Sequence, residues 1–251
     1  MAKSILKQSL QALAFLHENG IAHGDLQPGN MLFALDDDID MQPEDALRQE
    51  ENVQTESISP PVQRLDGKQD KWAPRYLCIA QPPAPFTNYA KGFKIRLSDM
   101  GGAYFFTSPP TKSITPRGLR APELVLTGTT NKTLDIWNDD HLLSLTARLG
   151  ALPDELFKHW KSSPLYFTAG KLFNCQPGGV AEGGEPLMLG QTSMEDWFDQ
   201  TCPDLDEEEG RQVKMLMRWI LQYDPAKRPS PAEILSDPWF GEIEVESGSF
   251  K

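Results

Sequence analysis

The stretch HGDLQPGN, residues 23–30, constrains the fold of this chain more than any other part of its sequence. Apolar residues recur at helical spacing before it, which predicts an amphipathic helix over residues 2–18 that ends at the Asn-Gly pair 19–20. The run MLF after it, residues 31–33, is suited to a short buried strand. A histidine, a carboxylate and an amide therefore lie on a loop between a helix and a strand, held by glycine and proline.

The residues of this loop suit phosphoryl transfer, which needs a carboxylate to orient the attacking hydroxyl, ligands for magnesium and a cradle for the phosphates. Asp25 can face an acceptor hydroxyl while the amide oxygen of Asn30 reaches a metal. Asp99, at the end of the predicted strand FKIRLSD, is a candidate second ligand, because magnesium favours oxygen donors. A lone Asp in a Gly/Pro loop is usually a turn residue, but this combination in this order favours catalysis.

The rest of the 251-residue chain predicts a mainly α (α+β) fold with a long polar insertion. Residues 35–89 carry too little apolar surface to offset their chain entropy, so we expect them to be a largely disordered insertion. The segment CQPGGVAEGGEP, residues 175–186, is predicted to be a loop. Helical patterns follow the insertion, over residues 139–149, 154–160 and 207–222 and from Pro231 onward.

The charge and cysteine content narrow the class of protein. A net charge of −12 argues against a nucleic-acid or anionic-membrane surface and would attract a basic substrate. The cysteines are scattered without CxxC spacing, which indicates reduced thiols, and no apolar run has membrane length. The N-terminus is not a signal peptide. We therefore expect a cytoplasmic or nuclear monomer without a direct nucleic-acid or membrane partner.

Together the motifs resemble the C-terminal lobe of a eukaryotic protein kinase, over most of the chain apart from the insertion. HGDLQPGN resembles the catalytic loop, SDMGGA the metal-binding DFG segment, RAPEL the APE segment, LDIW the start of the central helix and DPAKRPSPAEIL the closing segment. The resemblance implies ATP and Mg²⁺ as cofactors, catalytic roles for Asp25, Gln27 and Asn30, and cofactor or metal contacts for Asn30, Asp99 and Gly101. It also implies structural roles, with Arg228 paired to Glu123, for His23, Glu123, Asp135 and Arg228.

Within the kinases, the chain resembles the SR-protein-kinase-like branch of serine/threonine kinases, especially its fungal members. Three features carry this resemblance: the insertion before the DFG strand, the form SDMGGAYFF, and the helix-plus-insert pattern DDHLLSLTARLGALPDELFKHW. The resemblance implies transfer of phosphate to serines of Arg/Ser-rich proteins, which are basic substrates.

Two alternatives stay open beside this interpretation. HGDLxPGN is also the catalytic loop of aminoglycoside- and choline-type small-molecule phosphotransferases, although APE, DIW and the Arg228 segment favour a protein kinase. The other alternative is a catalytically dead pseudokinase fragment that acts as a binding module.

Several positions depart from the kinase pattern. The usual Arg before the catalytic Asp is Gly24, so no guanidinium is available there to bind an activation-loop phosphate. The usual Lys is Gln27, which donates a hydrogen bond but brings no charge to a γ-phosphate. The threonine expected seven residues before Glu123 is Pro116, and whether Thr115 takes its role is open.

We also expect two parts of a kinase to be missing. The chain has no GxGxxG motif and no VAIK-type lysine, so the N-terminal lobe is absent from it. Trp137 runs directly into Asn138, where a long central helix is expected, so we expect that helix to be deleted, through a skipped exon or a mispredicted gene model or because the chain is a degenerate non-catalytic paralogue. The remaining helices would then lose their main partner, at about 2 kcal/mol for each Leu-sized side chain left exposed.

Overall fold

The computed structural model describes residues 1–35, 39–43, 62–68, 71–72, 74–77, 86–87, 89, 92–116, 119–137, 142–167 and 192–241. The chain divides into two compact units, residues 1–32 with 95–251 and residues 33–94. The second unit contains the whole predicted insertion, of which pieces such as the 3₁₀ helix η2 (Ile39–Met41) are described. The predicted loop 175–186 and residues 138–141 lie outside the described residues.

Short helices dominate the first unit, as the sequence predicts. In chain order its elements are α1 (Ala2–Glu18), β1 (Ile21–Ala22), η1 (Pro28–Asn30), β2 (Met31–Phe33, whose last residue falls in the second unit), β3 (Ile95–Leu97), η4 (Met100–Gly102), β4 (Tyr104–Phe105), α3 (Pro122–Thr127), η6 (Lys132–Ile136), α4 (Leu142–Leu149), α5 (Asp154–Phe157), η7 (Ser163–Leu165), α6 (Met194–Thr201), α7 (Glu207–Ile220), η8 (Pro225–Lys227), α8 (Pro231–Leu235) and η9 (Pro238–Phe240).

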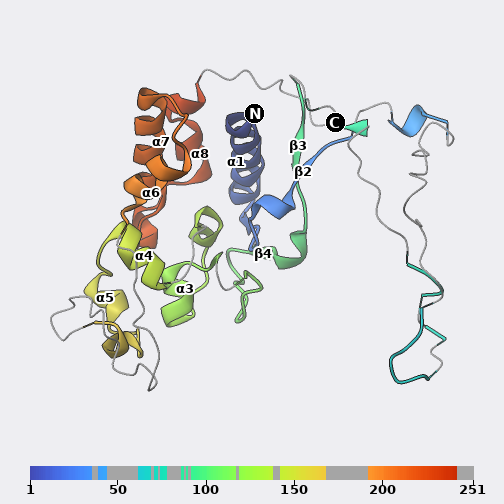
Figure 1. Ribbon diagram of the computed structural model, residues 1–251, viewed down its shortest axis with the longest axis horizontal. Coiled ribbons are helices and arrows are strands. Elements are labelled where there is room, and N and C mark those ends of the chain that lie inside the picture. The colour runs from blue at the N-terminus through green and yellow to red at the C-terminus, as the bar shows by residue number, and fades with distance from the viewer. Residues whose placement is uncertain are drawn as a thin grey trace. The chain divides into compact units, whose positions relative to one another are not determined.

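Helix α1 has the predicted bounds and leads the chain into the candidate site. Leu13 on its inner face is fully buried, and burial of a side chain of that size contributes about 2 kcal/mol. The helix ends at Asn19, whose side chain donates to the Phe15 carbonyl, and Gly20 turns the chain with φ +73°. α1 packs against α8, β1 and β3 (Figure 1).

Two small sheets hold the segments that carry the site. β1 pairs antiparallel with β4, with Ala22 opposite Tyr104, and β2 pairs with β3. The sequence predicts strands at MLF and FKIRLSD, which are β2 and β3, but it does not predict the second ladder, between β1 and β4. Strands of two or three residues are too short to show a period-two pattern, so the sequence does not reveal the partner of β1.

The C-terminal helices form the first of two hydrophobic clusters. Its buried members come from α7, α8 and η9, and α1 contributes Leu10. α8 begins as predicted, with Pro231 at its first position and a capping box in which Ser230 and Glu233 satisfy each other's backbone N–H groups. The buried residues of this cluster are Leu216, Ile234, Trp239 and Phe240.

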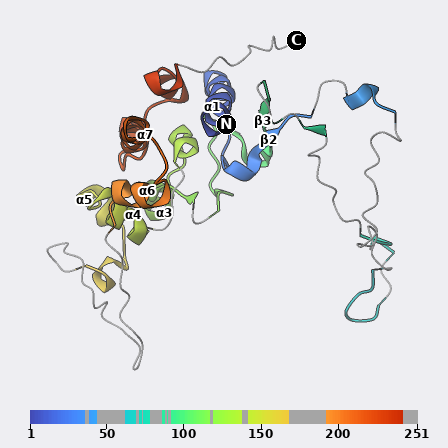
Figure 2. The same cartoon turned by 45° about the horizontal axis from the view of Figure 1, so that its top comes forward.

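The second cluster lies where α3, α4 and η6 meet. Ala121, Trp137 and Leu145 form its buried centre. α3 contacts α5, α4 contacts α6, and these helices gather together in both views (Figures 1 and 2). The predicted helix 139–149 is described from Leu142 onward, where it is α4.

The residues LDIW adopt a 3₁₀ helix rather than the start of a long central α-helix. Ile136 packs against the first hydrophobic cluster, whereas Trp137, which is 2% exposed, lies at the centre of the second. The remaining helices contact one another in the described residues, while Phe15 of α1 and Met215 of α7 are exposed. α1 contacts α8, and the short η6 segment contacts both clusters.

No helix within the described ranges is both long enough and apolar enough to cross a membrane.

Candidate functional site

The catalytic-loop residues predicted from the sequence form a hydrogen-bonded cluster around Asp25. Oδ2 of Asp25 accepts from Nε2 of Gln27 at 3.0 Å and from Nδ2 of Asn30 at 3.3 Å. Nδ2 of Asn30 also donates to the backbone carbonyl of Asp25 at 2.8 Å. Oδ1 of Asp25 is buried and has no hydrogen-bond partner within the described residues. The loop thus holds one carboxylate oxygen and leaves the other as a free acceptor.

The local sequence explains this arrangement. Gln27 is extended, and Pro28 after it begins η1 with the backbone angle that a helix start requires. One 3₁₀ turn then brings Asn30 back toward Asp25, because the N–H of Asn30 donates to the carbonyl of Gln27 at 2.9 Å. The chain continues directly into β2.

Asp135 anchors the loop from η6. Its Oδ2 accepts from the backbone N–H of His23 and its Oδ1 accepts from that of Gly24, both at 2.8 Å. Nε2 of His17 lies 2.9 Å from Oδ2, and the Asp135 carboxylate is buried. A buried carboxylate with three hydrogen bonds is well satisfied and fixes the backbone beside Asp25. The role of His17 is not evident from the sequence, since it ends a helix 118 residues before its partner.

His23 links the catalytic loop to the strand that precedes Asp99. Its ring is fully buried, and Nδ1 accepts from the backbone N–H of Asp25 at 3.3 Å. Nε2 lies 3.1 Å from the carbonyl of Ser98. Because Nδ1 accepts, Nε2 must carry the proton that is donated to that carbonyl, which fixes the tautomer. His23 therefore has a structural contact on each side.

The predicted metal-binding segment SDMGGA lies against Asn30 through Ser98. The N–H and the hydroxyl of Ser98 both donate to the backbone carbonyl of Asn30, at 2.8 Å and 3.1 Å. Asp99 is exposed and has a left-handed backbone, φ 60° and ψ 62°. At Gly101 an added Cβ would lie 3.2 Å from Oδ1 of Asp99, so the loop passes close to that carboxylate.

These residues fit a magnesium site by the chemistry of their donors. Asn30 donates hydrogen bonds through its nitrogen, which leaves its amide oxygen for a cation, and the exposed Asp99 carboxylate supplies a charged oxygen. No group of three His, Cys, Asp or Glu side chains suited to a metal occurs in the part of the chain that the structure describes. The candidate donor set is therefore one amide and one carboxylate.

The segment before APE contacts the catalytic loop through Thr115, the position that the sequence leaves open. Oγ1 of Thr115 donates to the carbonyl of Gly24 at 2.8 Å. Nε of Arg120 donates to the carbonyl of Thr115 at 2.8 Å, and the Ser113 hydroxyl accepts from the Thr115 N–H. The Thr115 side chain thus tethers this segment to the catalytic loop although it stands one place earlier than expected.

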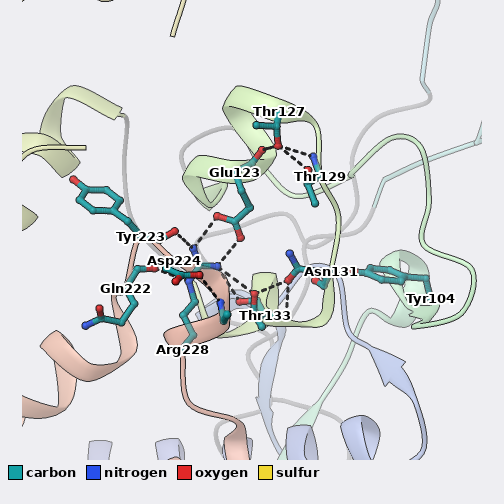
Figure 3. A network of polar contacts seen from close by, with 11 residues as sticks. Tyr104, Glu123, Thr127, Thr129, Asn131, Thr133, Gln222, Tyr223, Asp224 and Arg228 are labelled. Atoms are coloured by element: carbon teal, nitrogen blue, oxygen red, sulfur yellow. Dashed lines mark hydrogen bonds and ion pairs between the residues drawn. The ribbon is translucent and has the colours of Figure 1, made fainter. Parts of the chain in front are cut away.

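Glu123 and Arg228 form a buried ion pair (Figure 3). Both guanidinium Nη atoms donate to the carboxylate, at 2.7 Å and 2.8 Å, and Nε donates to the carbonyl of Gln222. The guanidinium also lies over the Trp137 ring, 4.6 Å from its centroid. The pair joins α3 to the segment that follows α7, which is a structural role.

Tyr104 extends the polar network of Figure 3 toward the catalytic loop. Its hydroxyl donates to the carbonyl of Asn131 at 2.9 Å, and Asn131 caps η6 by accepting from the N–H of Thr133. Burial raises the pKa of Tyr104, and the negative charge of Asp135 raises it further. The phenol therefore stays a hydrogen-bond donor over the physiological pH range.

Comparison with known proteins identifies relatives among protein kinases, although no protein-family model matches the chain. Dual specificity protein kinase CLK2 of Homo sapiens is 25% identical over 263 residues, which cover 95% of this chain and 43% of that protein. Serine/threonine-protein kinase SRPK of Physarum polycephalum is 23% identical, covering 97% and 61%. AFC1, a serine/threonine-protein kinase of Arabidopsis thaliana, is 22% identical, covering 96% and 49%.

A crystal structure of a kinase domain matches with a TM-score of 0.53 and 19% identity, covering 95% of this chain and 64% of that one. The fold is therefore mainly helical and similar to part of a protein kinase domain, and the chain is homologous to CLK- and SRPK-type serine/threonine kinases. The chain spans about half the length of the curated relatives that it matches, 43% of CLK2 and 49% of AFC1.

Proposed function

We propose that this homologue of CLK- and SRPK-type kinases takes part in ATP- and Mg²⁺-dependent transfer of phosphate to serine side chains of proteins. One observation carries the proposal. Asp25 has one oxygen held by Gln27 and Asn30 and a second, buried oxygen with no hydrogen-bond partner within the described residues. A buried acceptor of this kind is costly unless a ligand group completes its hydrogen bonding.

In this proposal the free oxygen of Asp25 accepts a hydrogen bond from the acceptor hydroxyl and takes its proton as the phosphate is transferred. The anchoring of the neighbouring backbone by Asp135 keeps that oxygen in place. Asn30 and Asp99 would hold Mg²⁺, which neutralises charge on the phosphates when it is bound. Gly101 lets the backbone pass close to the Asp99 carboxylate.

Gln27 is proposed to reach the transferred phosphate from the same loop. Its amide already donates to Asp25, at 3.0 Å, so it orients the base as well. Because an amide carries no charge, it stabilises the developing negative charge less than a lysine would. We therefore expect slower transfer than a lysine at this position would give.

The proposed substrate is a protein with Arg/Ser-rich segments. The net charge of −12 supports a basic substrate, since opposite charge accelerates encounter, and the similarity to SRPK- and CLK-type kinases supports the same class. We also propose that the chain acts as a monomer in the cytoplasm or nucleus.

The test is a phosphate-transfer assay in which only the acceptor changes. The chain would be incubated with Mg²⁺ and γ-labelled ATP, and with an Arg/Ser-rich peptide, the same peptide with alanine for serine, an aminoglycoside or choline. We expect label on the serine peptide alone. Label on the aminoglycoside or choline would instead support the small-molecule phosphotransferase. An absence of any label, together with peptide binding, would support the pseudokinase.

A further inference from the structure

Gly24, beside the catalytic aspartate, is in backbone contact with the metal-binding segment. Its φ is +79°, and a Cβ added there would lie 2.2 Å from the carbonyl oxygen of Gly102 and 2.9 Å from its carbonyl carbon. Both obstacles are backbone atoms, which no side-chain rotation can move away. The absence of the usual Arg at this position therefore has a steric cause, because only glycine fits between the two loops.

Gly102 is covered on another side by Ile114. A Cβ added at Gly102 would lie 2.5 Å from Cδ1 and 2.9 Å from Cγ1 of Ile114. Ile114 is otherwise 56% exposed, so the contact with Gly102 is one of the few that its side chain makes. A bulky apolar side chain thus lies against the glycine that touches the catalytic loop.

The next residue closes the arrangement. Thr115 donates to the carbonyl of Gly24 at 2.8 Å, and Arg120 holds the carbonyl of Thr115. Three segments therefore converge at one point, which we call the three-way junction: Gly24 of the catalytic loop, Gly102 of the metal-binding segment and Ile114 of the segment before APE. A cavity of about 130 Å³ is lined by all three.

We propose that the three-way junction sets the position of the metal-binding segment relative to Asp25, and that Ile114 is a positioning residue that holds it closed. The catalytic consequence rests on the proposed function. The device needs no phosphate, since it is made of a backbone contact, an apolar contact and a hydroxyl hydrogen bond. The three-way junction includes Gly24, the position at which the usual Arg would bind a phosphate on the activation loop.

The test is a set of small substitutions in which Ile114→Ala should restore the Tm of one glycine variant but not of the other. Gly24→Ala, Gly102→Ala and Ile114→Ala would be made singly, and Ile114→Ala would be combined with each glycine variant. Gly210→Ala is the matched control, because a Cβ there would meet only Phe198 at 3.8 Å, an ordinary contact. Thermal unfolding would be measured for all variants, and the Mg²⁺ concentration for half-maximal phosphate transfer would be measured where transfer occurs.

We expect Gly24→Ala to lower Tm by about 5 °C, since it forces a backbone shift at a left-handed position. Gly102→Ala displaces Ile114 and is expected to raise the Mg²⁺ requirement about tenfold, with a smaller loss of Tm of about 2 °C. Ile114→Ala should restore the Tm of Gly102→Ala but not that of Gly24→Ala, whose obstacle is backbone. Gly210→Ala should leave the Mg²⁺ requirement unchanged and should not lower Tm, because alanine favours a helix over glycine.

If Ile114→Ala restored the Tm of both glycine variants equally, or of neither, the proposed three-way junction would be contradicted. An unchanged Mg²⁺ requirement in Gly102→Ala would overturn its role in positioning. If the wild-type chain transfers no phosphate at all, the proposed function fails, yet the pattern of Tm rescue still decides whether the junction exists.

Discussion

At the scale of single residues, the two oxygens of Asp25 differ. One is held by two amide groups, and the other is buried without a donor within the described residues. The sequence identifies Asp25, Gln27 and Asn30 as a group because they lie within six residues of one another. It does not reveal which oxygen is free, since that depends on the 3₁₀ turn at Pro28.

Gln27 tests the electrostatic part of the proposal. Gln27→Ala removes a donor from both Asp25 and the phosphate, so kcat should fall about 100-fold with little change in the KM for the peptide. Gln27→Lys restores a cation and should raise kcat above the wild-type value. Steady-state kinetics with the Arg/Ser-rich peptide measure both. A lysine variant slower than the alanine variant would contradict the assignment.

The Glu123–Arg228 pair tests the structural part. Arg228→Ala leaves the Glu123 carboxylate buried without its partner and should lower the free energy of unfolding by about 3–5 kcal/mol in urea denaturation. The control is Arg211→Ala, whose guanidinium pairs with Glu208 on the exposed face of α7. That variant should leave the urea midpoint nearly unchanged. If both variants lost the same free energy of unfolding, burial would not be the reason that the Glu123–Arg228 pair is strong.

At the scale of elements, η6 and the residue that follows it make three contacts from consecutive positions. Asp135 holds the catalytic loop, Ile136 packs against the first hydrophobic cluster and Trp137 lies in the second. The resemblance places LDIW at the start of a long central helix that we expect to be deleted, and in the structure its first three residues belong to a 3₁₀ helix of five residues. Nothing local distinguishes these outcomes, because the choice depends on partners that lie far away in the sequence.

The ion pair between α6 and α7 should make a contribution to stability that depends on pH. Arg218 donates to Glu195 at 2.6 Å and lowers the pKa of that carboxyl. A lowered pKa adds stability above the unfolded-state pKa, and this stability is lost as pH falls through the folded-state value. The pair is partly exposed, so Glu195→Gln should cost about 0.5 kcal/mol at pH 7 and progressively less below pH 4, measured by urea denaturation.

The control for this pair is Glu18→Gln. Glu18 lies at the exposed end of α1 and has no ion pair within the described residues. Its substitution should not lower the free energy of unfolding at pH 7, because an anion at a helix C-terminus is not stabilising. A loss in Glu195→Gln that stays constant from pH 7 to pH 3 would show that the carboxylate charge is not its cause.

At the scale of the whole molecule, the sequence predicts more of the elements than of their contacts. α1 has its predicted bounds, and α7 ends at Ile220 rather than Gln222, because both helices have a clear 3.6-residue pattern. The pairing of β1 with β4 and the contact between His17 and Asp135 join segments that are distant in the chain. No local pattern specifies such contacts.

The most direct test of the central claim is the rate of phosphate transfer to an Arg/Ser-rich peptide by the wild-type chain and by Asp25→Asn. The substitution keeps the shape of the side chain but removes the base, so transfer should fall about 1,000-fold while the Tm changes little. Transfer by Asp25→Asn at the wild-type rate would contradict the assignment of Asp25 as the residue that accepts the hydroxyl proton.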